Sequence, residues 1–256
     1  MPQTHHALII AALSCVSFAA GFIDSIAGGG GLLLIPALLV AGVPPQSALG
    51  TNKFASVFGT GIATINFIRN KMVVWKIAAF GVAFSLLGSF LGSRAILVFS
   101  DATVGKIIVF LLPVAVAVTL VPKKPREGEW ELSGARLLLA VPLICLCIGF
   151  YDGFFGPGTG SFLILAFYLL AGLDLVRASA TAKVFNLASG VSALTVFLFG
   201  GKVLFEIGVP LAVANVAGNY AGSALAIKRG SKVVKTFLVV SLSIAFVSLL
   251  LKYFKK

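Results

Sequence analysis

Four ionisable residues stand inside long apolar stretches of the chain: Asp24, Lys53, Asp152 and Lys183. An ionisable group at the centre of a lipid bilayer costs at least ~2.5–3.5 kcal/mol, so such residues predict a functional site. One interpretation is an anion site, in which Lys53 and Lys183 approach a shared cavity from opposite halves of the chain. In the other, the aspartates and lysines only pair to hold helices together, or the lysines reach out to the membrane interface.

The two aspartates are also candidates to carry a proton. Burial favours the neutral form of a carboxyl group, which brings proton binding toward physiological pH. We therefore expect Asp24 and Asp152 to be proton-coupling sites if the movement of an anion is coupled to protons.

Two glycine clusters follow the aspartates. Residues 28–31 are four consecutive glycines, and residues 156–160 read GPGTG. Free backbone amides at the start of a helix, together with the positive end of the helix dipole, bind anions. Pro157 has no amide hydrogen, so we expect the second cluster to offer fewer donors than the first. The alternative use of small residues in a membrane is close helix packing.

Hydroxyl and amide side chains surround both lysines. They suit an oxyanion, although they could equally bond to neighbouring helix carbonyls. The predicted substrate-binding residues are Lys53, Lys183, Thr51, Asn52, Thr181, Asn186, Gly28, Gly29, Gly30, Gly31, Gly156, Gly158, Thr159 and Gly160.

These residues belong to an internal repeat. GFID at 21–24 recurs as GFYD at 149–152, ALGTNK at 48–53 as ASATAK at 178–183, and GSFLGS at 88–93 as GNYAGS at 218–223. The first offset is 128 and the other two are 130, which places a two-residue insertion between Gly160 and Ala178. Together with the glycine clusters, these ordered matches indicate a duplication. We predict a first membrane repeat at 1–121, a cytoplasmic linker at 122–135 and a second membrane repeat at 136–256.

Composition requires that these repeats lie in a membrane. Of 256 residues, 59% are hydrophobic and only 11% are charged, whereas soluble domains carry roughly 25% charged residues. Each half contains about five apolar segments, which predicts an all-α polytopic protein with 8–10 membrane segments. They are residues 7–26, 31–43, 49–68, 74–99 and 104–121, then 136–154, 160–172, 179–199, 203–227 and 233–251.

Two of these segments, 31–43 and 160–172, are short for a span, which needs ~20 residues. Because each follows a glycine cluster, we expect broken or re-entrant helices there. Two GxxxG pairs lie elsewhere, Gly88 with Gly92 and Gly218 with Gly222. For these pairs close helix packing is the better explanation.

Lysine and arginine predict the orientation. The net charge of +12 comes from basic residues at segment ends, in three groups: residues 69–76, the linker, and residues 228–235. Five crossings per half place all three groups in the cytoplasm and make the two halves an inverted repeat. Four crossings would place the third group outside, against the positive-inside rule. The favoured arrangement instead leaves Lys252, Lys255 and Lys256 outside.

Several other functions have little support. His5 and His6 lie in the N-terminal tail without further ligands, and Cys145 and Cys147 lie in an apolar run, so we predict no metal and no cofactor. No phosphate-binding loop and no catalytic constellation occur, so neither ATP hydrolysis nor another enzyme activity is expected. The basic residues form no stripe with interleaved aromatics, which argues against nucleic acid.

The chain resembles the sulfite exporter (TauE/SafE) family, also grouped with sulfonate uptake permeases. The resemblance rests on GFIDSIAGGGG at 21–31, on Pro36, Gly42 and ALGTNK at 48–53, and on GFYDGFFGPGTG at 149–160. It extends over essentially the whole chain. It implies transport of sulfite, sulfonates or related sulfur-containing or organic anions. The second half has Ala182 where the first has Asn52, so a site that uses the asparagine is asymmetric.

The sequence therefore predicts a multi-pass secondary transporter of the cell inner membrane. Its expected partners are a small anionic substrate, H⁺ as the coupling ion, and the lipid bilayer, and a homodimer is left open. We expect alternating access between two inverted halves. A passive anion channel is the alternative, and a membrane-embedded enzyme is a weaker one.

Overall fold

The computed structural model describes residues 3–120, 134–234 and 236–237, and in these residues it contains helices and no strands. The predicted linker and most of segment 233–251 lie outside the described residues. A short helical stretch begins at residue 231. Before it come α1 (Gln3–Ala27), α2 (Gly31–Val40), α3 (Pro45–Arg69), α4 (Trp75–Leu97), α5 (Asp101–Leu120), α6 (Gly134–Phe154), α7 (Thr159–Leu170), α8 (Leu175–Phe199) and α9 (Phe205–Arg229).

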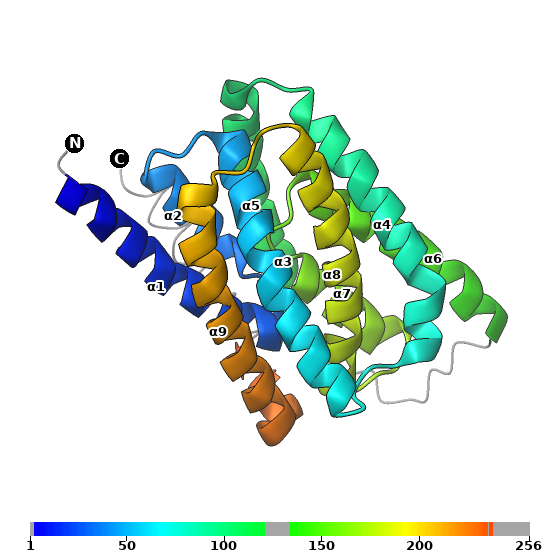
Figure 1. Cartoon of the computed structure of the whole chain (residues 1–256). Helices are drawn as coiled ribbons and strands as arrows, with labels where there is room; N and C mark the ends of the chain where they lie inside the picture. Colours follow the sequence, from blue (N-terminus) through cyan, green and yellow to red (C-terminus); the bar gives the residue numbers. More distant parts are fainter. Residues whose placement is uncertain (1–2, 121–133, 235, 238–256) are drawn as a thin grey trace.

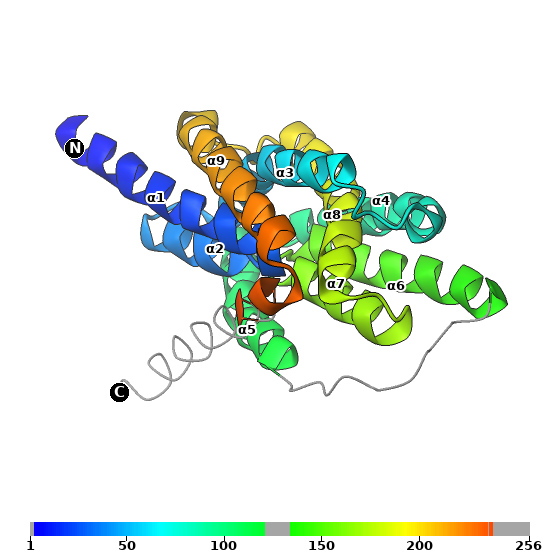
Figure 2. The same ribbon diagram turned by 90° about the horizontal axis from the view of Figure 1, so that it is seen from below.

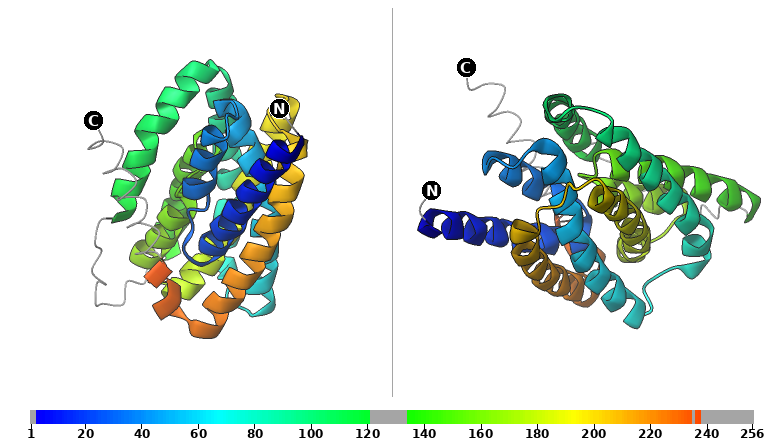
Figure 3. Two further views of the ribbon diagram at one scale, coloured as in Figure 1. Left: turned by 90° about the vertical axis from the view of Figure 1, so that its left-hand side faces the viewer. Right: turned by 45° about the horizontal axis from the view of Figure 1, so that its top comes forward.

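The first two helices of each half form a pair that turns back on itself. Gly28 and Gly29 have φ angles of +72° and +109°, a region in which other residues are strained, so α1 cannot continue through them. The ten residues of α2 then run back beside α1 (Figure 3). In the second half Gly156 and Gly158 end α6 in the same way. The predicted re-entrant helices are therefore present, but α1 and α2 enter and leave at one end of the bundle and are not two separate crossings.

Helix lengths locate the insertion between the repeats. Helix α2 has 10 residues and its counterpart α7 has 12. Helices α3 and α8 both have 25 residues and begin at Pro45 and Leu175, an offset of 130. The two extra residues therefore lie in α7, within the predicted range between Gly160 and Ala178.

The two halves interlock through their fourth helices. Helix α4 of the first half packs on α6 and α8, and α9 of the second packs on α1 and α3. A Cβ atom at Gly88 or Gly92 would overlap the α6 backbone, and one at Gly218 or Gly222 would overlap the α1 backbone. Both GxxxG pairs are therefore packing surfaces, as predicted.

Threonine hydroxyls fix the ends of these helices. Thr51 Oγ1 accepts a hydrogen bond of 3.1 Å from the Leu204 amide at the start of α9. Thr181 Oγ1 accepts the equivalent 3.1 Å bond from the Val74 amide at the start of α4. Helix α3 thus begins beside the start of α9, whereas α8 begins at the opposite end, and the two run in opposite directions (Figure 1).

Many polar side chains are buried in the bundle, and many large apolar side chains are exposed on its outside. Helices α1, α4 and α8 each contain a stretch long and apolar enough to cross a membrane. Helices α3 and α9 are less apolar, but their polar side chains are buried, among them Asn52, Lys53, Asn215 and Asn219. Large apolar side chains such as Phe110 and Phe199 are exposed. Such an outside suits lipid and not water.

The basic residues lie mainly at one end of the bundle. The lower end in Figure 1 holds the end of α3 with Arg69, the start of α4 with Lys76, and the end of α9 with Lys228 and Arg229. Figure 2 shows the molecule from that end. Two of the three predicted basic groups therefore share a side, and the third is the linker.

Candidate functional site

The two helix breaks meet at the centre of the protein. Ser161 Oγ, in the first turn of α7, donates to the carbonyl oxygens of Ala27 and Gly28 at 2.9 and 3.1 Å. Gly28 lies so close to the backbone of Gly160 that a Cβ atom there would overlap it. The α1–α2 break of one half is thus held against the start of α7 in the other.

Two ion pairs cross between the halves. Lys53 Nζ on α3 lies 2.8 Å from Asp152 Oδ1 on α6. Lys183 Nζ on α8 lies 2.6 Å from Asp24 Oδ2 on α1. Each lysine therefore pairs with the aspartate of the other repeat, a choice of partner that the sequence left open. All four groups are largely buried, so removal of any one leaves an uncompensated charge in a medium of low dielectric.

The first glycine cluster is already occupied by a carboxylate. The amides of Gly29 and Gly30 donate to Asp24 Oδ1 at 3.1 and 3.2 Å. The Gly28 amide donates to the Asp24 carbonyl at 2.8 Å, and the Gly156 amide of the second cluster donates to the Tyr151 carbonyl at 3.1 Å. The expectation of free amides is therefore wrong for Gly28, Gly29, Gly30 and Gly156, because the Asp24 side chain folds back onto the first break and backbone carbonyls at the ends of α1 and α6 take the other two amides. Among the described residues, no acceptor takes the amides of Gly31, Gly158 and Gly160.

The second aspartate has a different environment. Pro157 stands where Gly29 stands in the first half, and it has no amide hydrogen. Within the described chain, Lys53 is the one hydrogen-bonding or charged partner of the Asp152 side chain. The neighbouring Tyr151 donates its hydroxyl to the Pro157 carbonyl at 2.6 Å and so does not donate it to Asp152.

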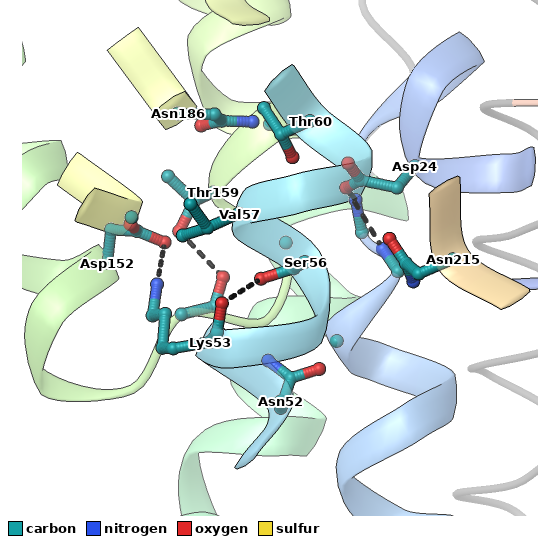
Figure 4. Close-up of a pocket in the computed structure, with 17 residues that line it drawn as sticks. Asp24, Asn52, Lys53, Ser56, Val57, Thr60, Asp152, Thr159, Asn186 and Asn215 are labelled. Carbon is teal, nitrogen blue, oxygen red and sulfur yellow. Dashed lines mark hydrogen bonds and ion pairs between the residues drawn. The ribbon is translucent and has the colours of Figure 1, made fainter. Parts of the chain in front are cut away.

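A small polar cavity lies between the breaks (Figure 4). Its volume is about 50 Å³, and since one water needs ~10–15 Å³ by this kind of measure, it holds only a few non-hydrogen atoms. Polar and charged side chains from both halves line it. They are Asp24, Asn52, Lys53, Ser56, Thr60, Asp152, Thr159, Asn186 and Asn215, with Val57 and the glycines 29, 30, 31, 156, 158, 160 and 190.

Some cavity groups are free to bind a ligand. Lys53 makes one ion pair and so keeps two further N–H groups. Neither Asn52 nor Asn186 makes a side-chain hydrogen bond within the described residues, and Asn186 Oδ1 is buried without a partner. In contrast, Ser56 and Thr159 donate to backbone carbonyls at 3.2 and 2.7 Å. Lys53 and the two asparagines are therefore the side chains best placed to contact a bound molecule.

Four of the predicted binding residues do not line this cavity. Thr51 and Thr181 are buried beside the starts of α9 and α4, where their hydroxyls accept hydrogen bonds from backbone amides. Lys183 has an exposed fraction of 0% and is turned to Asp24. Gly28 is in contact with Gly160. The two lysines thus do not share one cavity: Lys53 faces it and Lys183 does not.

Other lining residues had not been identified from the sequence. Ser56 and Thr60 lie about one and two turns after Lys53 on the same side of α3, so helical spacing could have found them. Ser56 also occupies the repeat position of Asn186, at the offset of 130. Asn215 comes from α9, and no local pattern indicates that α9 reaches the cavity.

Comparison with known proteins agrees with this architecture. A family model described as "Sulfite exporter TauE/SafE" matches residues 13–249. The chain is 41% identical over 237 residues to the probable membrane transporter protein ORF9 of Sinorhizobium sp, with 91% of this chain and 88% of that protein covered. It is 39% identical over 236 residues to the probable membrane transporter protein YfcA of Escherichia coli K12, with coverage of 91% and 86%.

A plant protein is similar over a shorter stretch. Sulfite exporter TauE/SafE family protein 5 of Arabidopsis thaliana is 31% identical over 94 residues, which are 35% of this chain and 21% of that protein. No solved structure matches the chain. The family match covers most of the chain, and the relatives of similar length are named as transporters and not as enzymes, so the chain belongs to the sulfite exporter TauE/SafE family and is a multi-pass membrane transporter.

Proposed function

We propose that the protein is a secondary transporter that binds a small anion beside Lys53 in the central cavity. The observation that carries this proposal is the buried ammonium of Lys53, which faces a polar cavity between two broken helices. An anion there meets a positive charge in a medium of low dielectric, where the attraction is far stronger than in water. The amides of Gly31 and Gly160, each in the first turn of a helix, add donors and the favourable ends of two helix dipoles.

The cavity favours a compact oxyanion as substrate. Asn52 and Asn186 supply amide donors on opposite walls, so several oxygens of one group can each find a partner. The small volume excludes a large organic acid in this conformation. Sulfite or a short sulfonate fits these features, and the name of the family points to the same chemistry.

The relation between the halves supports alternating access. Helices α3 and α8 run in opposite directions, and the two re-entrant pairs meet at the cavity. Inverted-repeat transporters hold their substrate between such broken helices and expose it to one side at a time. Lys53 faces the cavity and its repeat counterpart Lys183 does not, so the two halves are not in equivalent states in this conformation. Asp24 and Asp152 are the candidates for proton coupling.

The charge distribution supports one orientation. We place the end of the bundle that holds Arg69, Lys76 and Lys228 in the cytoplasm, and the chain in the cell inner membrane. The linker then lies in the cytoplasm with them, and the two repeats have opposite topology.

Counterflow in proteoliposomes tests the proposal. Vesicles loaded with unlabelled sulfite or methanesulfonate are diluted into a trace of the same labelled anion. A carrier accumulates the label transiently against its gradient, because exchange is faster than net flux. Equilibration without an overshoot would indicate a passive channel, and no uptake of either anion would contradict the proposed substrate class.

A further inference from the structure

The two ion pairs at the centre of the protein are related by the repeat but are not equivalent. Asp24 receives three donors: Lys183 at 2.6 Å on Oδ2 and the amides of Gly29 and Gly30 on Oδ1. Asp152 receives one donor from the described residues, Lys53 at 2.8 Å on Oδ1. Both oxygens of Asp24 are thus bonded, whereas no described residue donates to Asp152 Oδ2.

The difference has a cause in the sequence. At the offset of 128 that relates the two breaks, Gly29 corresponds to Pro157, which cannot donate. Gly158 corresponds to Gly30, but its amide does not reach Asp152. Lys53 is therefore the one donor to the Asp152 carboxylate among the described residues, while Asp24 would keep two amide bonds even without its lysine.

The exposure of the two lysines to the cavity also distinguishes the two ion pairs in this way, whereas the exposure of the two aspartates does not. Lys53 lines the cavity, and Lys183 is completely buried outside it. The Asp24 side chain is 17% exposed and that of Asp152 only 7%, and both border the cavity. Exposure alone would thus favour Asp24 as the reactive carboxylate. The hydrogen bonds favour Asp152 instead, and we give them more weight. Asp24 must lose three donors before its carboxylate is free, whereas Asp152 must lose one.

We propose that the Lys53–Asp152 pair is the one that opens when the anion binds, and that a proton neutralises the released Asp152, so that one proton moves with each monovalent anion. This inference rests on the proposed anion site. The Asp24–Lys183 pair stays closed and holds the first break in place. The charges balance in this step. The Lys53 ammonium exchanges the Asp152 carboxylate for the anion, and the carboxylate takes one H⁺ from the solution.

The charges around Asp152 explain why a proton is needed. Asp152 faces Lys53 of α3 and, across the cavity, Asp24 of α1. The charge of Asp24 is itself neutralised by Lys183 of α8. On the same helix as Asp152, the Tyr151 hydroxyl donates its hydrogen bond to the Pro157 carbonyl. Among the described residues, α4 and α7 contribute no charged group to the cavity. An anion on Lys53 would therefore leave Asp152 as an unpaired buried carboxylate, which is costly unless it is protonated.

Proton uptake on anion binding tests the inference with the purified full-length protein. Methanesulfonate is added in weakly buffered detergent solution with a pH indicator, and its affinity is measured from pH 6 to 8. Methanesulfonate is anionic throughout this range, so any proton that is bound is bound by the protein. We expect about one proton per bound anion and an affinity that falls about tenfold for each unit of rising pH, as linkage to one proton requires.

Two variants identify the carboxylate. Asp152→Asn, a neutral isostere of the protonated acid, should bind methanesulfonate without proton uptake and with an affinity independent of pH. Asp174→Asn, which removes an exposed carboxylate at the start of α8, controls for the substitution itself and should retain uptake of about one proton. Binding without proton uptake in the wild type, or proton uptake that survives in Asp152→Asn, would overturn the inference while leaving the anion site intact. Absence of binding to the wild type would overturn the proposed function itself.

Discussion

Lys53 and Asp152 form a 2.8 Å ion pair although they come from different repeats of the chain. Lys183 and Asp24 form the reciprocal pair, so each repeat neutralises the charge of the other. Neither repeat can bury its own lysine and aspartate in this way by itself. The charge balance at the centre of the protein therefore depends on contacts between the two halves.

The crossed pairing predicts which double variants are tolerated. Lys53→Gln leaves Asp152 unpaired and should destabilise the protein by about 3–5 kcal/mol, the usual cost of breaking a buried pair. Adding Asp152→Asn should restore most of the stability, because the site is neutral again. Adding Asp24→Asn instead should lower it further, because Lys183 then also loses its partner. Melting temperatures in one detergent compare the three, and equal rescue by both second substitutions would refute the crossed pairing.

The packing of α4 on α6 predicts a strong effect of one methyl group. A Cβ atom at Gly92 would overlap the backbone of Phe150, so Gly92→Ala must push the helices apart and should cost about 1–3 kcal/mol or more. Gly61→Ala is the matched control, since its Cβ would meet only Leu187 Cδ1 at 3.9 Å. This control should be neutral or slightly stabilising, as alanine favours a helix over glycine. Similar melting temperatures for the two variants would contradict the packing.

The threonines beside the lysines should act on stability and not on the substrate. Thr51→Val and Thr181→Val each remove the acceptor for a backbone amide at the start of a helix. We expect a loss of about 1–2 kcal/mol in stability for each, with unchanged anion affinity. Thr195→Val, at an exposed position of α8, is the control for the substitution itself. A large loss of affinity at unchanged stability would place the threonines in the binding site instead.

Cysteine labelling tests the orientation. In a background without Cys15, Cys145 and Cys147, Asn70→Cys and Ser231→Cys should react with an impermeant reagent from the cytoplasmic side. Ser100→Cys, between α4 and α5, should react from the opposite side. Labelling of Asn70→Cys and Ser231→Cys from different sides would exclude the proposed inversion of the halves.

Much of the fold could be predicted from the sequence, because it depends on local patterns. Apolar segments mark the helices, the glycine clusters mark the breaks, and the GxxxG pairs mark the packing faces of α4 and α9. The offset change from 128 to 130 placed a two-residue insertion between Gly160 and Ala178, and α7, which lies largely in this range, is two residues longer than α2. Each of these signals lies within a few turns of the residues it describes.

The site was predicted less well, because it depends on contacts between distant segments. The sequence places Lys53 and Lys183 at equivalent positions, yet only Lys53 lines the cavity. The position of Thr51 beside Lys53 suggested a shared role, but adjacent residues on a helix face different ways, and Thr51 reaches α9 instead. The fate of the Gly29 and Gly30 amides depends on a side chain that folds back from the preceding helix, and no spacing rule predicts that.

Anion binding to a site from which only the Lys53 charge has been removed tests directly whether Lys53 holds the anion. Titration calorimetry with methanesulfonate and sulfite compares three proteins. The first carries Asp152→Asn alone, and the second carries Asp152→Asn together with Lys53→Gln. The third carries Asp152→Asn together with Lys76→Gln and controls for the loss of a positive charge at an exposed lysine. The single variant and the Lys76 control should bind alike, since neither alters the ammonium in the cavity. The Lys53 double variant should bind about 30-fold more weakly or worse, in line with ~2–5 kcal/mol for the loss of one partner of a buried charged contact. Equal affinity in all three would contradict the claim that Lys53 holds the anion.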